Sequence, residues 1–452
     1  MHLPMCKLNN IRLWILSAVL FPVLTSAAQP ADADSIPPKE NELTIELQFL
    51  ARGESRYGGL VAEATDDEDE EVAAKSNFVQ GRTRLPINFC RDWLEARVTP
   101  QHAGVWGQSG KGSFNLYETW VRLTAPFGMF AQLGRVALSY DDERIIGSDD
   151  WAMAAQSHDV VRLGYEGHGH KAHVILAYNQ NTNVVTSGDT YYENGAQPYK
   201  TMQDLWYHYD FSRIPLGASL LFMNIGMQSA PDVPRRTWFQ HLLGGYVSFA
   251  PSRWKAEFSY YHQFGNNEHG MKIDAWMASA KAAFNPNAKL GFAVGFDYLS
   301  GDSKFAVPPR GGIGVIRHEV IKGFSTVYGS HHKFYGAMDF FYVSAYLNGF
   351  TPGLQNAYAT VVYKPIQKLT LSGGYHYLAT ATKLEDMAMS LGHEVELQGR
   401  YSFSRDVNLS LGFSLMHGDE TMERLKRSSN NNLLRWGWIS LSVTPRIFST
   451  KW

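Results

Sequence analysis

Long apolar runs and cysteines are scarce in this sequence. A membrane-spanning helix needs about 20 consecutive apolar residues, and no such run occurs in the chain. The mean hydropathy is −0.25, so the two features together exclude a helical membrane protein. The chain has two cysteines, Cys6 and Cys90. Cys6 precedes an apolar stretch that we expect to be removed, so Cys90 should have no internal partner for a disulfide.

Complete motifs for catalysis, metals or cofactors are also lacking. His318-Glu319 and His393-Glu394 begin like zinc-protease motifs, but neither has the second histidine that the motif requires. The formal net charge is −2, from 41 basic and 43 acidic residues, which gives no case for nucleic-acid binding. We therefore expect no enzyme, no cofactor and no metal site.

The N-terminus has the three parts of a secretory signal. Lys7 and Arg12 precede an apolar stretch at 13–24, and small residues follow at 26–28. This order is typical of a cleaved signal peptide rather than a membrane anchor. We predict a signal peptide at 1–28 and a single domain at 29–452.

The C-terminal stretch shows a pattern that recurs along the whole chain. Within 435–445, Ile439, Leu441 and Val443 alternate with Trp438 and small polar residues. One face of such a strand suits lipid and the other suits water. Aromatic residues make up 13% of the chain, which suits the girdles of an outer-membrane barrel. The sequence therefore predicts an all-β fold, a transmembrane antiparallel β-barrel of the outer-membrane type.

Short and long connections alternate between the expected strands. Short joints such as 126–128 and 251–253 are rich in Gly, Pro or Ser, and longer polar stretches separate them. This spacing predicts about 18 strands, with short periplasmic turns, long outside loops and both termini on the periplasmic side. The longest stretch, 301–353, is the candidate for a loop that folds into the pore. The acidic run at 66–71 should form a solvated loop.

Charged residues within the strands should point into the barrel, because a lipid-facing charge near the bilayer midplane costs roughly 2–4 kcal/mol. Apolar neighbours such as Val136 and Leu138 are assigned to lipid. The resulting lumen-facing cationic residues are Arg82, Arg84, Arg97, Arg122, Arg135, Arg162, Lys255, Lys281 and Arg400; inward acids include Glu257, Asp297 and Glu396. The arginines could form a track for an anionic solute, or pair with the acids and stiffen the barrel.

Two stretches carry a family resemblance. Residues 133–140 read L-G-R-V-A-L-S-Y and lead into D-D-E-R-I-I-G at 141–147, then Trp151, then S-H-D-V-V-R-L at 157–163. A second stretch begins at 332–339 with H-K-F-Y-G and a following Asp. Together they resemble the alginate-export family of outer-membrane β-barrel porins.

The resemblance implies an 18-stranded barrel that passes an anionic uronate polysaccharide along an arginine-rich lumen, with periplasmic export partners. The positions that match the family's charged residues are Arg135, Arg144, Arg162, Asp142, Glu143 and Asp159. The chain departs from the family at Val136, where Gln is frequent, and at Asp141, where Gly is frequent. Neither departure removes an arginine.

Opposite charges also cluster beside Trp151. We expect these residues to form a network at the barrel rim that orders the loop after the fifth strand: Asp142, Glu143, Arg144 and Asp159. The function expected is passive diffusion or export of anionic solutes, with acidic saccharides as one class. The expected partners are outer-membrane lipid and the solute, with no nucleic acid.

Two alternatives stay open. A structural or adhesion barrel with a blocked lumen fits the long 301–353 stretch. A rim hydrolase using Ser157, His158 and Asp159 fits less well, because adjacent residues on a strand point to opposite faces and cannot form one triad.

Overall fold

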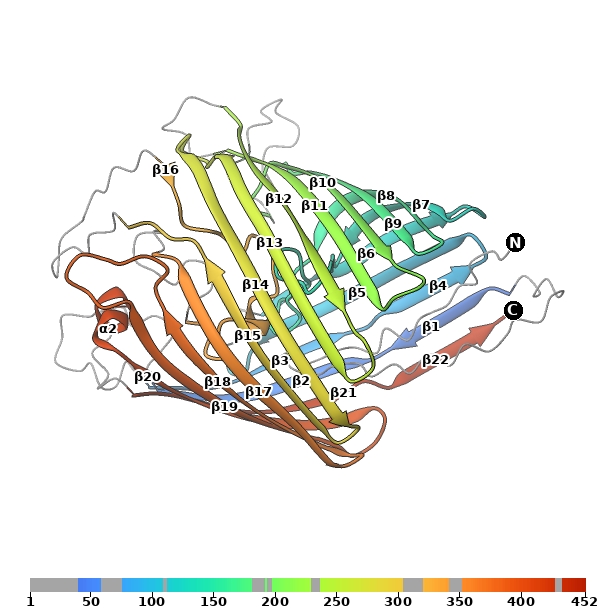
Figure 1. Ribbon diagram of the computed structural model, residues 1–452. Coiled ribbons are helices and arrows are strands. Elements are labelled where there is room, and N and C mark those ends of the chain that lie inside the picture. Colours follow the sequence, from blue (N-terminus) through green and yellow to red (C-terminus); the bar gives the residue numbers. More distant parts are fainter. Residues whose placement is uncertain are drawn as a thin grey trace.

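The computed structural model describes residues 40–57, 75–108, 112–180, 192, 197–228, 236–303, 320–340, 352–426 and 433–452. The predicted signal peptide, the acidic run at 66–71 and parts of the 301–353 stretch lie outside these ranges. Within them the chain forms one sheet that closes on itself (Figure 1). No helix in the described ranges is long and apolar enough to cross a membrane.

Alternating apolar and polar residues give the strands their two faces. The strands of the first half are β1 (Glu42–Glu46), β2 (Gln48–Tyr57), β3 (Lys75–Arg84), β4 (Ile87–Arg91), β5 (Leu94–Val105), β6 (Ser113–Thr124), β7 (Met129–Val136), β8 (His158–Gly167), β9 (His170–Tyr178), β10 (Thr201–Asp210) and β11 (Leu216–Met227). The second half contains β12 (Trp238–Phe249), β13 (Trp254–Asn266), β14 (Lys272–Asn287), β15 (Leu290–Leu299), β16 (Val320–Ile321), η1 (His331–Lys333), β17 (Leu354–Ile366), β18 (Leu369–Ala379), β19 (Ser390–Ser402), β20 (Val407–Gly418), α2 (Glu420–Lys426), β21 (Leu433–Val443) and β22 (Arg446–Lys451).

Three of the barrel strands are interrupted. β1 and β2 are separated by Leu47, β3 and β4 by residues 85–86, and β21 and β22 by residues 444–445. Two of these breaks contain a proline, Pro86 and Pro445, which cannot donate a ladder hydrogen bond. Counting each interrupted strand once and leaving out the two-residue β16 gives eighteen strands. The prediction of an 18-stranded antiparallel barrel is confirmed.

The barrel closes between its first and last strands. β2 pairs antiparallel with β21, and β1 pairs antiparallel with β22. The amide of Asn41 donates to the carbonyl of Trp452 at 2.9 Å, which ties the two ends of the described chain together. The start of β1 and the end of β22 lie at one end of the barrel, and helix α2, in a long connection, lies at the other (Figure 1). The short predicted joints at 126–128 and 251–253 are turns between neighbouring strands.

A belt of apolar side chains covers the outside. Its most exposed members include Leu133, Leu220 and Val294, each about 60% exposed. Ile439 and Leu441 lie on the same outer face, as the sequence predicts, while Trp438 is buried. Cys90 lies on β4 and is 4% exposed.

Two loops fold inward and fill part of the lumen. Residues 137–157 and 320–340 contribute Leu138, Ile146 and Tyr328 to one apolar cluster with wall residues of several strands. The two loops also pair directly, because Ile146 and Tyr328 form a parallel bridge. The described part of the 301–353 stretch therefore lies against the interior wall.

The apolar belt leads to a prediction about the depth at which its residues lie in the bilayer. Leu441→Arg should lower the free energy of unfolding by roughly 2–4 kcal/mol, because it places a charge near the middle of the lipid-facing belt. Leu433→Arg, on the same face at the end of β21, should cost no more than about 1 kcal/mol. Denaturant titration in lipid vesicles measures both values. Equal losses in the two variants would contradict the assigned depth.

Candidate functional site

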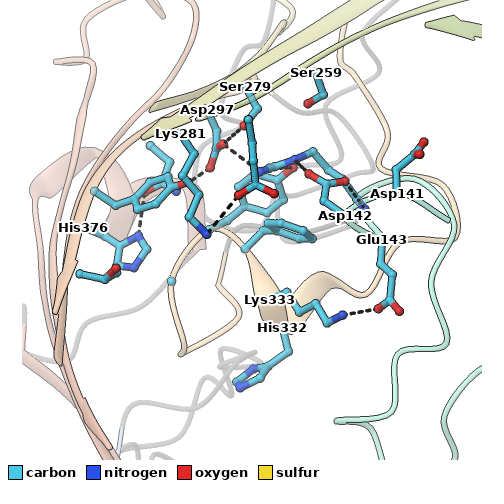
Figure 2. Close-up of a pocket in the computed structure, with 18 of the residues that line it drawn as sticks. Asp141, Asp142, Glu143, Ser259, Ser279, Lys281, Asp297, His332, Lys333 and His376 are labelled. Carbon is cyan, nitrogen blue, oxygen red and sulfur yellow. Dashed lines mark hydrogen bonds and ion pairs between the residues drawn. The ribbon is translucent and has the colours of Figure 1, made fainter. Parts of the chain in front are cut away.

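The inward loops leave a polar cavity against one wall of the barrel. Its volume is about 450 Å³. The loops supply one side of the lining, and strands β12 to β15 and β17 to β19 supply the other (Figure 2). The charged and histidine side chains in the lining are Asp141, Asp142, Glu143, Arg144, Lys255, Glu257, Lys281, Asp297, His332, Lys333, His376 and Glu396.

Arg144 fastens the first inward loop to the wall. Its Nη2 lies 3.1 Å from a carboxylate oxygen of Asp297 on β15, and both side chains are almost fully buried. Its Nε donates to Asp142 at 3.2 Å, and its Nη1 donates to the Tyr335 hydroxyl at 3.0 Å. The ring of Phe334 lies 4.0 Å from the guanidinium carbon. The Arg144 side chain therefore joins both inward loops to the wall of the barrel.

Asp297 is the wall side of this contact. Ser279 on β14 donates to its Oδ1 at 2.7 Å, and Asn356 on β17 donates to its Oδ2 at 2.9 Å. The ring Nδ1 of His376 on β18 lies 2.9 Å from the Asn356 amide oxygen. The buried carboxylate is thus fully coordinated by neighbouring strands, as a buried charge must be. The sequence brings these groups together because each lies at an inward position of its strand (Figure 2).

Two lysines converge on one glutamate in the same wall. The ammonium of Lys255 lies 2.8 Å from Glu257, and that of Lys281 lies 3.8 Å from it. The Tyr246 hydroxyl also donates to Glu257. Both lysines keep about a quarter of their side chains exposed to the lumen. A soluble anion that enters the cavity can therefore reach them.

The predicted rim network is only partly assembled. Asp142 and Arg144 are hydrogen-bonded, as expected. Glu143 instead contacts Lys333 and accepts a 2.8 Å hydrogen bond from Ser330, both on the second inward loop. Figure 2 shows the Glu143 and Lys333 side chains meeting at the edge of the cavity. The network joins the two loops rather than ordering one of them alone.

Arg135 does not face the lumen and Asp159 does not join the rim network, contrary to the prediction. They are cross-strand partners and form a bidentate pair at 2.8 and 2.7 Å. Arg135 is in phase with the exposed Leu133, so both members of the pair face outward. Val136, assigned to lipid, is 4% exposed and packs in the interior cluster. The alternating residues of β7 were assigned to the wrong faces because the barrel interior at this level is as apolar as lipid.

The other predicted arginines are mostly neutralised by acids. Arg82 and Arg84 both contact Asp150 of the first inward loop, at 3.1 and 2.6 Å. The remaining pairs are Arg97 with Glu118 at 2.9 Å and Arg122 with Glu166 at 3.3 Å, and Arg162 donates to the Tyr140 hydroxyl at 3.3 Å. These contacts match the interpretation in which arginines pair with acids.

Of the nine cationic residues predicted to face the lumen, Lys255 and Lys281 line the cavity. Arg400 lies in the inward phase of β19, opposite to the outward Val395 and Leu397, but it is not part of the cavity lining. Lys281 and Asp297 were recognisable as inward from their alternation. Lys333 had no such signal, because it lies in a loop and reaches the cavity through contacts between distant segments.

Asp141 is an acid with altered ionisation in the first loop. Burial raises the pKa of Asp141 to about 6, although hydrogen bonds from Ser219 and Trp206 oppose the shift. The Trp206 indole donates to this carboxylate at 3.1 Å. Asp141 lines the cavity, so the charge of the cavity changes near pH 6.

The Arg144 contact leads to a second prediction. Arg144→Ala should cost about 3–5 kcal/mol, because it leaves the Asp297 carboxylate buried without its charged partner. The inward loops should then become sensitive to protease under conditions where the wild type is resistant. Limited proteolysis with mass spectrometry locates the cuts.

Arg135→Ala serves as the control, since its side chain faces outward and should leave the loops resistant. The electrophoretic shift of folded barrels on heating reports whether each variant is folded. A folded Arg144→Ala protein with wild-type protease resistance would show that the loop position does not depend on this pair.

No protein-family model and no curated protein matches the chain. Solved porin structures are similar to it. OccK9 (OpdG) of Pseudomonas aeruginosa has a TM-score of 0.59 and 11% identity, over 90% of this chain and 98% of that one. The BenF-like porin from Pseudomonas fluorescens Pf-5 has 0.58 and 13%, over 90% and 99%. OccK2 (OpdF) of Pseudomonas aeruginosa, solved in complex with glucuronate, has 0.57 and 13%, over 90% and 98%.

At these identities the likeness concerns the fold, and the fold is that of outer-membrane porin barrels. It does not single out the alginate-export family that residues 133–163 resemble. The coverage is nearly complete on both sides, so no large part of the described barrel lacks a counterpart. The chain has the architecture of an outer-membrane porin.

Proposed function

We propose that this protein is an outer-membrane channel for the passive diffusion of small solutes that carry a carboxylate, such as acidic saccharides. The observation that carries the proposal is the polar cavity beside the inward loops, where Lys255 and Lys281 converge on Glu257. A solute carboxylate can take the place of Glu257 as the partner of either lysine, since charge-assisted hydrogen bonds of this kind are strong.

The rest of the lining suits a sugar-like solute. The aromatic rings of Phe334 and Tyr358 offer apolar faces to a sugar ring. A volume of about 450 Å³ falls within the range of small-molecule sites, roughly 300–1,000 Å³. The similarity to OccK2, solved with glucuronate, supports the same solute class.

The inward loops favour a small solute over a polymer. They fill part of the lumen with an apolar cluster that includes Leu138 and Tyr328. A polysaccharide chain would have to pass this cluster along its whole length. For this reason we propose an acidic mono- or oligosaccharide, and periplasmic export partners are not needed for its diffusion. A barrel with a blocked lumen is the alternative that the same cluster favours.

The solute class yields a third prediction. In planar bilayers, the wild-type channel should pass glucuronate better than a neutral sugar of similar size. Lys281→Gln should weaken glucuronate binding about tenfold, the usual consequence of losing one charge-assisted hydrogen bond. Lys289→Gln, which changes an exposed lysine in a short turn, should leave binding unchanged.

Three outcomes would count against the proposal. Wild-type protein that conducts no current would favour the blocked barrel. Equal passage of glucuronate and the neutral sugar would reject the anionic solute class. Unchanged glucuronate binding in a folded Lys281→Gln protein would reject the assigned lysine site, while leaving the channel function intact.

Asp141 gives a fourth prediction, on pH. As the pH falls from 7.5 to 5, Asp141 gains a proton, because burial raises its pKa to about 6. The cavity loses one negative charge, so the ratio of anion to cation permeability should rise. The Asp141→Asn channel should lack this step. Reversal potentials across a salt gradient measure the ratio, and an identical pH profile in both proteins would contradict the assignment.

A further inference from the structure

Three side chains cluster on the outer surface at the loop end of strands β3, β2 and β21. Tyr57 is the last residue of β2, and its direct cross-strand partners are Lys75 on β3 and Arg435 on β21. The Lys75 ammonium lies 5.4 Å from the centroid of the Tyr57 ring. The Arg435 guanidinium carbon lies 4.9 Å from the same centroid. Two cations from different strands therefore bracket one tyrosine.

The alternation of the strands places this cluster outside the barrel. Arg435 is in phase with the exposed Ile439, whereas its neighbour Trp436 is buried at 2% exposure. On β2, the inward positions are taken by Arg52 and Glu54, which are buried, and Tyr57 lies in the opposite phase. The cluster faces the side that carries the apolar belt.

Its height on the barrel is set by the loops. Tyr57 ends β2 and Lys75 begins β3, on either side of the long 58–74 connection. An outward arginine at the bilayer midplane costs roughly 2–4 kcal/mol, but near the interface the cost falls to about 0–1 kcal/mol. Residues at strand ends beside long loops lie at the outer interface, where lipid headgroups are found. The cluster is therefore placed at headgroup height.

The described outward positions around Arg435 carry no acidic side chain. Among the residues that the structure describes, the Arg435 guanidinium has no hydrogen-bond acceptor, and its contact is with the Tyr57 ring. The outward positions beside it on the three strands are Ser55, Asn77 and Leu433, none of which is acidic. A lipid-side arginine with such neighbours needs an anion from outside the protein.

We propose that Lys75, Tyr57 and Arg435 bind a phosphate group of a phosphorylated glycolipid in the outer leaflet. Ammonium and guanidinium groups both form short, charge-assisted hydrogen bonds to phosphate oxygens. The Tyr57 ring holds the two cations near each other through cation–π contacts. The site rests on the outer-membrane placement of the barrel and is independent of which solute passes through the lumen.

Arg135 provides a built-in comparison. It also faces outward and lies near the loop end of its strand, but Asp159 neutralises it at 2.7 Å. A purely structural outward arginine is thus paired within the protein, whereas Arg435 is not paired with any described acid. Arg135 is therefore the matched control for a lipid site at Arg435.

The experiment uses the full chain in detergent and bisphosphorylated lipid A as the probe, with binding measured by native mass spectrometry. The double variant Lys75→Gln/Arg435→Gln should bind about 30-fold more weakly than wild type, the combined effect of two basic residues at a membrane surface. Arg135→Gln should bind as wild type does. Lipid A with both phosphates removed should bind wild type as weakly as the double variant binds the phosphorylated form.

Two further measurements test whether free phosphate or a metal ion accounts for the binding of lipid A. Inorganic phosphate alone should not compete at millimolar concentration; full competition would assign the site to free phosphate and overturn the lipid proposal. Binding should persist in EDTA. Binding that requires Mg²⁺ would indicate a metal-bridged contact instead of direct binding by Lys75 and Arg435, and would also overturn the proposal.

The electrophoretic shift on heating shows whether each variant is folded. If the double variant folds poorly, the single variants are compared instead: Arg435→Lys keeps the positive charge and should retain most of the wild-type affinity for lipid A, whereas Arg435→Gln should lose affinity. A folded double variant that binds lipid A like wild type would refute the site. So would an equal loss in Arg135→Gln.

Discussion

Closure of the sheet is the constraint on which the other features depend. In hydrocarbon every backbone N–H and C=O needs a partner within the protein, and only a closed barrel gives all strands two neighbours. Here the seam between β1–β2 and β21–β22 completes that pairing. Closure then fixes two faces for every strand, because side chains alternate across the sheet. The lipid belt, the lumen and the height of each residue all follow from it.

The fold could be predicted from the sequence for this reason, but the direction of each face could not always be. Period-two alternation separates two sets of residues without saying which set meets lipid. Where the lumen is polar, as at Ser440 and Ser442, the assignment is simple. At β7 the interior is apolar because inward loops pack there, so Val136 and Leu138 resembled lipid-facing residues and Arg135 was placed inside. The error came from tertiary packing that has no local signal.

The candidate site was harder to predict because it is assembled from distant segments. The contact from Arg144 to Tyr335 joins residues 191 positions apart, and that from Glu143 to Lys333 joins residues 190 apart. Sequence resemblance marked Arg144 and its acidic neighbours, and alternation marked Lys255 and Lys281. Neither could show that these groups share one cavity, because the loops that bring them together have no periodic pattern.

The buried pair of Arg144 and Asp297 explains how an apolar filling and a polar cavity coexist in one lumen. Apolar contacts hold the loops inside the barrel but specify position poorly, because such cores tolerate alternative packing. A buried ion pair adds little net stability, since desolvation offsets its attraction. It is satisfied in one geometry only, with Asp142, Tyr335 and Asp297 all in place. The pair therefore selects the loop position that leaves the side chains of Lys255 and Lys281 partly exposed to the lumen, and the proposed passage of solutes depends on that position.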